Sequence, residues 1–254
     1  MEKRRLSKRI MGNNGDEHPK WREALNTAEA FWDGIVQEDH AILRVLADNA
    51  KIAPQIRKCL ASTPQTSLEV GVGPLGLGIS GFLPEIPFRF ALDPLSPALP
   101  KVSGELPATS SEKLRAYMRQ EGAGVRYVVA RGEEVPIQSA SMDLVICSNV
   151  LDHASRPMTI LREIHRVLKP GGAFFFEVDT FSALGLVKWH SWTKHIHKNE
   201  VMVKGHPHRM YEANVIRDLR ASGFELRKLH GHTLASSLIG HARDSMFLGI
   251  KCSP

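Results

Sequence analysis

Four glycines follow a short apolar run that ends in an acid, in the stretch LEVGVGPLGLG at residues 68–78. Gly71, Gly73 and Gly76 have the spacing G-x-G-x-x-G, which is typical of a loop between a strand and a helix. Such a loop brings bare backbone N–H groups and a helix N-terminus against an anionic or polar ligand. The spacing fits a dinucleotide-binding fold and several other folds, so it does not name the ligand by itself.

A carboxylate at the end of the next predicted strand adds to this pattern. Asp93 closes the segment FRFALD, 17 residues after Gly76. At this distance it can accept hydrogen bonds from both hydroxyls of a ribose. The sequence that follows, DPLSP, also favours a turn, so a local structural role is the alternative. The register with the glycine loop favours the ribose.

Three of the 12 histidines stand where acid–base chemistry is expected. Histidine suits this chemistry because its ordinary pKa is close to neutral pH. His153 follows a predicted strand in NVLDH, where it could also start a helix, with Asp152 serving the same turn. His206 and His208 precede a later helix, and Arg209 beside them suits a carboxylate or phosphate. We predict that one of these three histidines is a base or a substrate contact.

Short apolar strands alternate with helices over most of the chain. The run Phe174–Phe176 is apolar on both faces, which is typical of a central parallel strand covered on both sides. A helix is predicted from Pro157 to Leu168 and another in YEANVIRDLRASG. The predicted strands are SLEVG, FRFALD, VRYVVA, MDLVICS, AFFFEVD, FELRKLHG and SMFLGIKC. This order predicts an α/β fold with a doubly wound, mostly parallel sheet.

The residues before the first strand divide into a tail and a helical cap. The first nine residues hold five cations, which predicts a solvated tail, with a nucleic-acid-binding arm as the alternative. Helical spacing from Trp21 to Ile35, a helix from about Asp39 and a third helix opening at Pro54 predict the cap. The predicted tail is residues 1–20, and the predicted cap is residues 21–64. The predicted main domain is residues 65–254, and it contains an insertion or lid at about residues 181–210.

Composition and charge exclude several classes of protein. With 254 residues and 43% hydrophobic content, the chain can fill a sizeable core. No apolar run approaches the ~20 residues that cross a bilayer, and the basic N-terminus lacks the apolar region of a signal peptide. Cys59, Cys147 and Cys252 have no metal-ligand or redox spacing, which fits a reducing compartment. We expect a cytoplasmic protein without a membrane partner.

Several motifs in one order resemble the class I S-adenosylmethionine-dependent methyltransferases, in particular the type 11 group. These are the glycine loop, Asp93, RGEEVPIQSASMDLVICSNVLDH and LREIHRVLKPGGAFFFEV, within about Ser67 to Thr180. The resemblance implies a Rossmann-like methyltransferase fold of seven strands, S-adenosylmethionine as cofactor and S-adenosylhomocysteine as product. A nicotinamide-dependent dehydrogenase would use the same loop and acid. Two features disfavour a dehydrogenase. These are the VLKPGG turn and the final strand, which the resemblance implies to be antiparallel.

The resemblance also implies a set of cofactor-binding residues. Glu69 would position the loop and the α-amino group of the cofactor, since an idle buried acid costs free energy. Many relatives have an aspartate before Gly132 for the adenine amino group, but this chain has Arg131. Backbone atoms or Glu133 would take that role. The implied cofactor-binding residues are Glu69, Gly71, Val72, Gly73, Gly76, Asp93, Pro94, Gly132, Glu133, Ser148 and Asn149.

The predicted insertion interleaves basic residues with Trp189 and Trp192. It predicts a lid over a polar or anionic acceptor, with a structural helix pair, a dimer contact or a nucleic-acid grip as alternatives. His190, His195 and His197 lie close together but lack the tighter spacing and the partners usual for zinc. We predict no metal site there or elsewhere.

The sequence predicts an enzyme that methylates a small molecule, such as a sugar or a natural-product scaffold. The candidate histidines favour oxygen over nitrogen as the acceptor atom. The alternatives are an RNA or protein methyltransferase that grips its substrate through the basic segments, and a non-catalytic binding module of the same fold. The formal charge of +6 permits an anionic partner without requiring one, and we do not expect nucleic acid. The oligomeric state is left open.

Overall fold

The structure is a computed structural model, and it describes the main domain and the helices before it. The predicted tail lies outside the described residues, and so does most of the predicted insertion. The described residues are 21–37, 39–74, 76, 78–95, 112, 116, 124–182, 184, 205–233 and 242–252.

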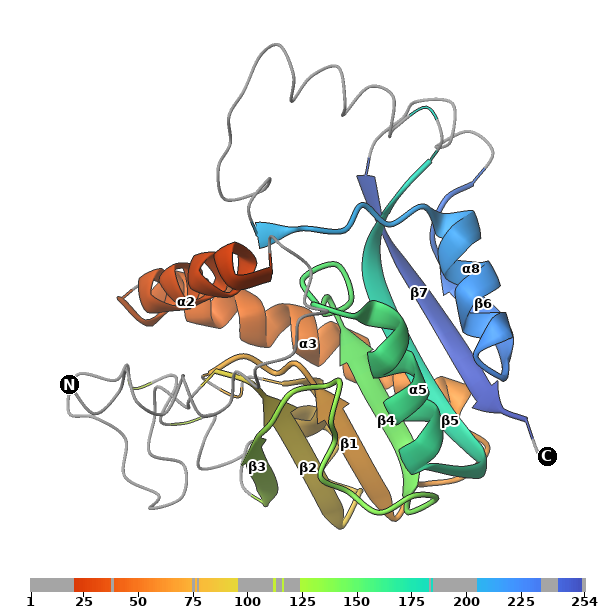
Figure 1. Ribbon diagram of the computed structural model, residues 1–254. Helices are drawn as coiled ribbons and strands as arrows, with labels where there is room; N and C mark the ends of the chain where they lie inside the picture. Colours follow the sequence, from red (N-terminus) through yellow and green to blue (C-terminus); the bar gives the residue numbers. More distant parts are fainter. Residues whose placement is uncertain are drawn as a thin grey trace.

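Seven strands form one sheet (Figure 1). The strands are β1 Thr66–Val70, β2 Phe88–Asp93, β3 Val125–Val129, β4 Met142–Ser148, β5 Leu168–Phe181, β6 Phe224–His230 and β7 Ala242–Lys251. Their spatial order is β3-β2-β1-β4-β5-β7-β6. Strands β1 to β5 pair in parallel, whereas β7 runs antiparallel to both β5 and β6. The predicted doubly wound sheet and its antiparallel last strand are therefore confirmed.

Helices cover both faces of this sheet. Helices α5 (Pro157–Val167) and α8 (Glu212–Ala221) lie on one face, and α3 (Asp39–Cys59) and the short 3₁₀ helix η1 (Ile79–Phe82) lie on the other (Figure 1). Helix α2 (Trp21–Gln37) packs beside α3. No helix in the described part of the chain combines the length and the apolarity needed to cross a membrane.

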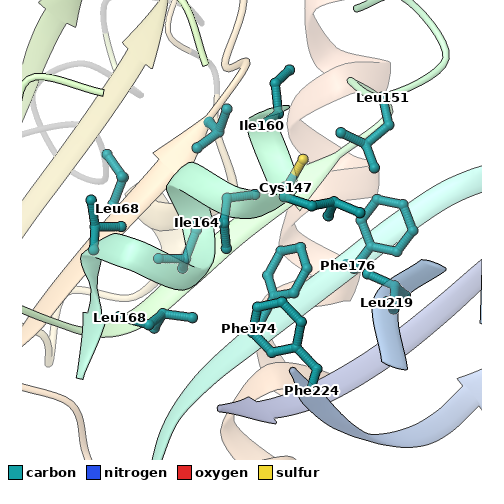
Figure 2. Packing of buried hydrophobic residues seen from close by; sticks show 14 of the residues in the cluster. Leu68, Cys147, Leu151, Ile160, Ile164, Leu168, Phe174, Phe176, Leu219 and Phe224 are labelled. Atoms are coloured by element: carbon teal, nitrogen blue, oxygen red, sulfur yellow. The ribbon is translucent and has the colours of Figure 1, made fainter. Parts of the chain in front are cut away.

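The middle of β5 anchors the core on both faces. Phe174, Phe175 and Phe176 have no solvent exposure. Because successive side chains on a strand point to opposite faces, Phe174 and Phe176 pack toward α5 and α8, as Figure 2 shows. Phe175 packs with buried residues of α3 and η1. The triple phenylalanine therefore joins the two hydrophobic layers through one strand.

The cap contains two helices in the described residues, so the predicted third helix is wrong. Helix α3 continues through Pro54 to Cys59. An interior proline removes one intrahelical hydrogen bond and costs roughly 3 kcal/mol. Pro54 itself is exposed, whereas Ile52, Ala53 and Ile56 around it are buried against the sheet. Burial of this apolar face on both sides of the proline keeps the helix intact.

Truncation of Phe175 tests how much the second layer contributes to stability. We expect Phe175→Ala to lower the free energy of unfolding by about 3 to 5 kcal/mol, because the side chain is fully buried. The matched control is Phe88→Ala, since Phe88 is 52% exposed at the start of β2. Its cost should stay below about 1 kcal/mol. Chemical denaturation followed by circular dichroism measures both values, and equal losses would contradict this account of the core.

Candidate active site

A cavity of about 720 Å³ opens at the carboxyl ends of β1, β2 and β4, beneath α2. This volume lies in the range of small-molecule sites, roughly 300 to 1,000 Å³. Gly76 does not line it but donates its N–H to the carbonyl of Gly73 at 3.0 Å, within the loop turn. The other predicted cofactor-binding residues line the cavity: Glu69, Gly71, Val72, Gly73, Asp93, Pro94, Gly132, Glu133, Ser148 and Asn149.

Close packing and backbone shape explain why the loop needs glycine. Gly71 and Gly73 have φ angles of +80° and +71°, which other residues rarely adopt. A Cβ atom on Gly71 would overlap the side chain of Val150, and one on Gly73 would lie 2.5 Å from the Trp32 ring. The loop is therefore bare because neighbouring side chains fill the space on one side of it.

Glu69 fastens the far end of the loop. Its carboxylate accepts hydrogen bonds from the N–H groups of Ile79 and Ser80 at 2.8 and 2.7 Å, and from the Ser80 hydroxyl at 2.6 Å. The residue is only 4% exposed, so these bonds replace the water that the carboxylate loses on burial. A side chain at Gly78 would collide with this carboxylate.

Asp93 fastens the near end of the loop. One carboxylate oxygen accepts the N–H of Gly73 and the other accepts the N–H of Leu95, both at 2.9 Å. Burial raises the pKa of Asp93 from its usual 3.8 to about 6, and the two amides offset only part of this effect. Each oxygen keeps a second acceptor site, because a carboxylate has about four lone-pair positions.

Arg131, which departs from the family pattern, connects the cap to the cavity. Its guanidinium lies 4.2 Å from the centre of the Trp21 ring, a cation–π contact. Its Nε atom lies 3.5 Å from the carboxylate of Glu133. Glu133 also accepts the N–H of Arg156 at 3.2 Å. The arginine thus holds the cap helix and the β3–β4 loop together.

Aromatic side chains of α2 form the cavity wall above the glycine loop. Trp32 covers Gly73, and Phe31 meets Trp32 edge to face with ring centres 5.6 Å apart. Helix α3 adds Arg44 and Asn49 to the wall. The helical spacing of Trp21, Phe31 and Trp32 was a visible signal for packing, but nothing in the local sequence pointed to Arg44 or Asn49.

His153 and His206 meet at another part of the cavity, around Asp152. The Nε2 atom of each histidine lies 3.6 Å from Oδ2 of Asp152. The two imidazole rings are 4.3 Å apart and tilted by 45°. Both histidines line the cavity, and the Asp152 side chain is 5% exposed. We call these three residues the Asp152 cluster.

The segment 205–210 docks onto the turn after β4 and completes this cluster. His153 donates its Nδ1 proton to the carbonyl of Gly205 at 2.5 Å, since a carbonyl can only accept. His208 donates its backbone N–H to the carbonyl of Asp152 and its Nε2 proton to the carbonyl of Ala154, at 3.2 and 2.9 Å. His208 therefore supports the turn and does not line the cavity, so the structure brings only two of the three candidate histidines together.

Acidic groups lie next to the Asp152 cluster. Asp179 lines the cavity and pairs across β5 and β7 with Asp244. Burial and the adjacent Asp244 carboxyl raise the pKa of Asp179 to about 7. Burial also raises the pKa of Glu177, although the Ser148 hydroxyl donates to it at 2.5 Å. The histidines 190, 195 and 197 and the lysines of the predicted lid lie outside the described residues.

Comparisons with known proteins point to methyltransferases. Residues 103–176 match the family model of a methyltransferase domain. The chain is 46% identical to thiol S-methyltransferase TMT1B of Homo sapiens over 52 residues, 20% of this chain and 21% of that protein. It is 30% identical to the malonyl-[acyl-carrier protein] O-methyltransferase of Marinomonas sp. (strain MWYL1) over 130 residues, 51% and 44% of the two chains. The chain thus spans less than half of the length of either relative.

The YcgJ protein of Bacillus subtilis has the same fold, with a TM-score of 0.60 and 14% identity over 82% of this chain and 100% of that chain. The cavity also suits the cofactor of this family. Asp93 has acceptor sites left for a ribose, and the glycine loop leaves its backbone open to the cavity. The matched domain and the lining of the cavity together make this chain similar to the class I S-adenosylmethionine-dependent methyltransferases.

Proposed function

We propose that this protein transfers the methyl group of S-adenosylmethionine to a small-molecule acceptor. The observation that carries the proposal is one cavity lined by the glycine loop and Asp93 and also by His153 and His206. The cofactor supplies a methyl group on an already activated sulfonium. The main task of the protein is therefore to hold the donor and the acceptor in line, which can contribute much of the rate.

On the donor side, the proposal gives Asp93 the ribose hydroxyls, through the acceptor sites that Gly73 and Leu95 leave open. Pro94 lies beside it for apolar contact with the adenine, and Gly132 and Glu133 line the cavity for the polar edge of that ring. Glu69 would reach the α-amino group. Ser148 and Asn149, at the end of β4, are proposed for the sulfonium end, because ligands of such sheets bind at the carboxyl ends of strands.

On the acceptor side, we assign activation to the Asp152 cluster. A hydroxyl acceptor is favoured, because it must lose its proton and the cluster supplies the polar groups that assist this loss. A thiol is the second candidate, because the similar human protein is named a thiol S-methyltransferase. The predicted anionic acceptor has less support. The described wall beside the cluster is acidic, with Asp179 in it.

Asp179 in the same wall argues against RNA as substrate, since a phosphodiester beside it would meet a carboxyl group. A non-catalytic binding module would have no use for two histidines gathered beside the donor cavity. A cytoplasmic location remains a prediction from the sequence.

Calorimetric titration with S-adenosylmethionine and S-adenosylhomocysteine tests the donor half. We expect both to bind, and Asp93→Asn to weaken binding by roughly 5- to 150-fold, the equivalent of about 1 to 3 kcal/mol for a lost hydrogen bond to a charged group. Asp218→Asn, at a partly exposed position of α8 that does not line the cavity, is the control and should change nothing. A wild type that binds neither ligand would remove the proposal. Labelled methyl incorporation into alcohol, thiol and amine panels then identifies the acceptor class.

The raised pKa of Asp93 predicts that affinity for S-adenosylhomocysteine increases with pH. Between its usual pKa of 3.8 and about 6, folded ligand-free protein holds a proton that the unfolded chain has released. This group's contribution to stability therefore falls as pH rises through that window. Ribose hydroxyls donate to the ionised form, so affinity should rise from pH about 5 to about 7 and then level off. Titrations at constant ionic strength measure this slope, which Asp93→Asn should remove.

Alanine substitutions at two glycines with the same backbone conformation distinguish the effect of backbone strain from the effect of the contact with Trp32. Gly73→Ala places a methyl group 2.5 Å from the Trp32 ring at a φ of +71°. Gly171→Ala imposes the same strain, at +74°, with nothing within 4 Å. We expect both variants to lose some stability, and only Gly73→Ala to lose affinity for S-adenosylhomocysteine, by roughly tenfold or about 1.4 kcal/mol. Equal affinities in calorimetry would show that the Trp32 contact does not shape the loop.

A further inference from the structure

The geometry points to a divalent-cation site, zinc first, formed by Asp152, His153 and His206. Two imidazoles and one carboxylate are the protein ligands of open zinc sites, which keep a fourth position for water or substrate. Each residue offers a ligand atom here, and these atoms lie within 4.8 Å of one another. The sequence did not reveal this grouping, because His206 stands 53 positions from His153.

The distances within the Asp152 cluster fit coordination better than hydrogen bonding. Oδ2 of Asp152 lies 3.6 Å from Nε2 of both histidines. A hydrogen bond between such atoms measures about 2.7 to 3.2 Å. With ligand bonds of about 2.0 to 2.1 Å, the corners of a tetrahedral site lie roughly 3.3 to 3.4 Å apart. The observed separations of 3.6 Å are close to this distance between two ligand atoms.

The position of the protons supports a cation between these atoms. His153 commits its Nδ1 proton to the carbonyl of Gly205, so a neutral ring turns the lone pair of Nε2 toward the Asp152 carboxylate. Two facing lone pairs repel unless a positive charge lies between them. The bond to Gly205 is also the kind of contact that orients a metal-ligating histidine in known sites.

Asp152 carries a buried carboxylate next to the two histidines. Its Oδ1 atom is buried and has no hydrogen-bond partner among the described residues, although such atoms are normally satisfied. A divalent ion held between the three residues would place positive charge beside this carboxylate.

Such an ion would activate an acceptor that carries an ionisable proton. His153 and His206 line the cavity, so the free coordination position faces it. There the O–H or S–H of the acceptor loses its proton to water, and a lone pair of the oxygen or sulfur forms the new bond to the methyl carbon. The carbon–sulfur bond of the donor breaks with its electron pair on sulfur, giving S-adenosylhomocysteine. This role rests on the proposed function, whereas the cation site itself does not.

Metal titration of the full chain, first stripped with a chelator, tests the site without any substrate. We expect one Zn²⁺ per chain by calorimetry, and Co²⁺ to give the visible absorption of a four-coordinate site. Asp152→Asn and His206→Ala should each weaken binding at least about 100-fold, the upper end of the loss seen for outer ligand partners. Circular dichroism checks that each variant is folded.

The matched control is His230→Gln, which changes an exposed histidine on the edge strand β6. It should bind Zn²⁺ as tightly as the wild type. Absence of Zn²⁺ and Co²⁺ binding, or equal binding by Asp152→Asn and His206→Ala, would overturn the site. Titration of the stripped protein with S-adenosylhomocysteine is scored separately, so a failed cation site and a failed donor assignment are distinguishable.

The activating role has its own readout. Methyl incorporation by stripped protein should fall and return with Zn²⁺, for a thiol or an alcohol acceptor. Full turnover in the stripped protein would show that a histidine base acts instead of a cation.

Discussion

The buried carboxylate of Asp93 makes the hydrogen bonds on which the proposed donor half of the cavity, formed by the glycine loop and Asp93, depends. It accepts the N–H groups of Gly73 and Leu95, and so fixes the loop after β1 against the end of β2. Because the group is buried, leaving either oxygen unpaired would cost about 1 to 3 kcal/mol. Glu69 applies the same constraint at the start of η1. Two buried acids therefore set the shape of a loop in which four of the eight residues are glycine.

The cap extends this constraint to the other side of the cavity. Trp32 packs on Gly73, and Trp21 receives the guanidinium of Arg131 from the loop after β3. A displacement of α2 would thus remove the roof of the cavity and loosen two of the loops that line it. The cap is therefore coupled through packing to the loops that line the cavity, and Arg131 is part of this coupling.

The sequence predicted those parts of the molecule that depend on neighbours in the chain. The strands, the glycine loop and Asp93 follow from apolar runs and local spacing, and their bounds agree with the structure to within a few residues for most elements. Pro54 misled the prediction because its cost is local, whereas the burial of Ile52 and Ile56 that outweighs it is tertiary. The pairing of Asp152 with His206 was likewise invisible, since it requires segment 205–210 to dock on the turn after β4.

The two halves of the cavity consequently depend on different parts of the fold. The proposed donor half is built from the ends of β1 and β2, where the bonds of Glu69 and Asp93 join residues of the first hundred positions. The Asp152 cluster needs the segment before α8, held by the contacts of Gly205 and His208 with the β4–α5 turn. A change that lifts this segment would separate His206 from Asp152 without breaking the bonds that Asp93 and Glu69 make to the glycine loop.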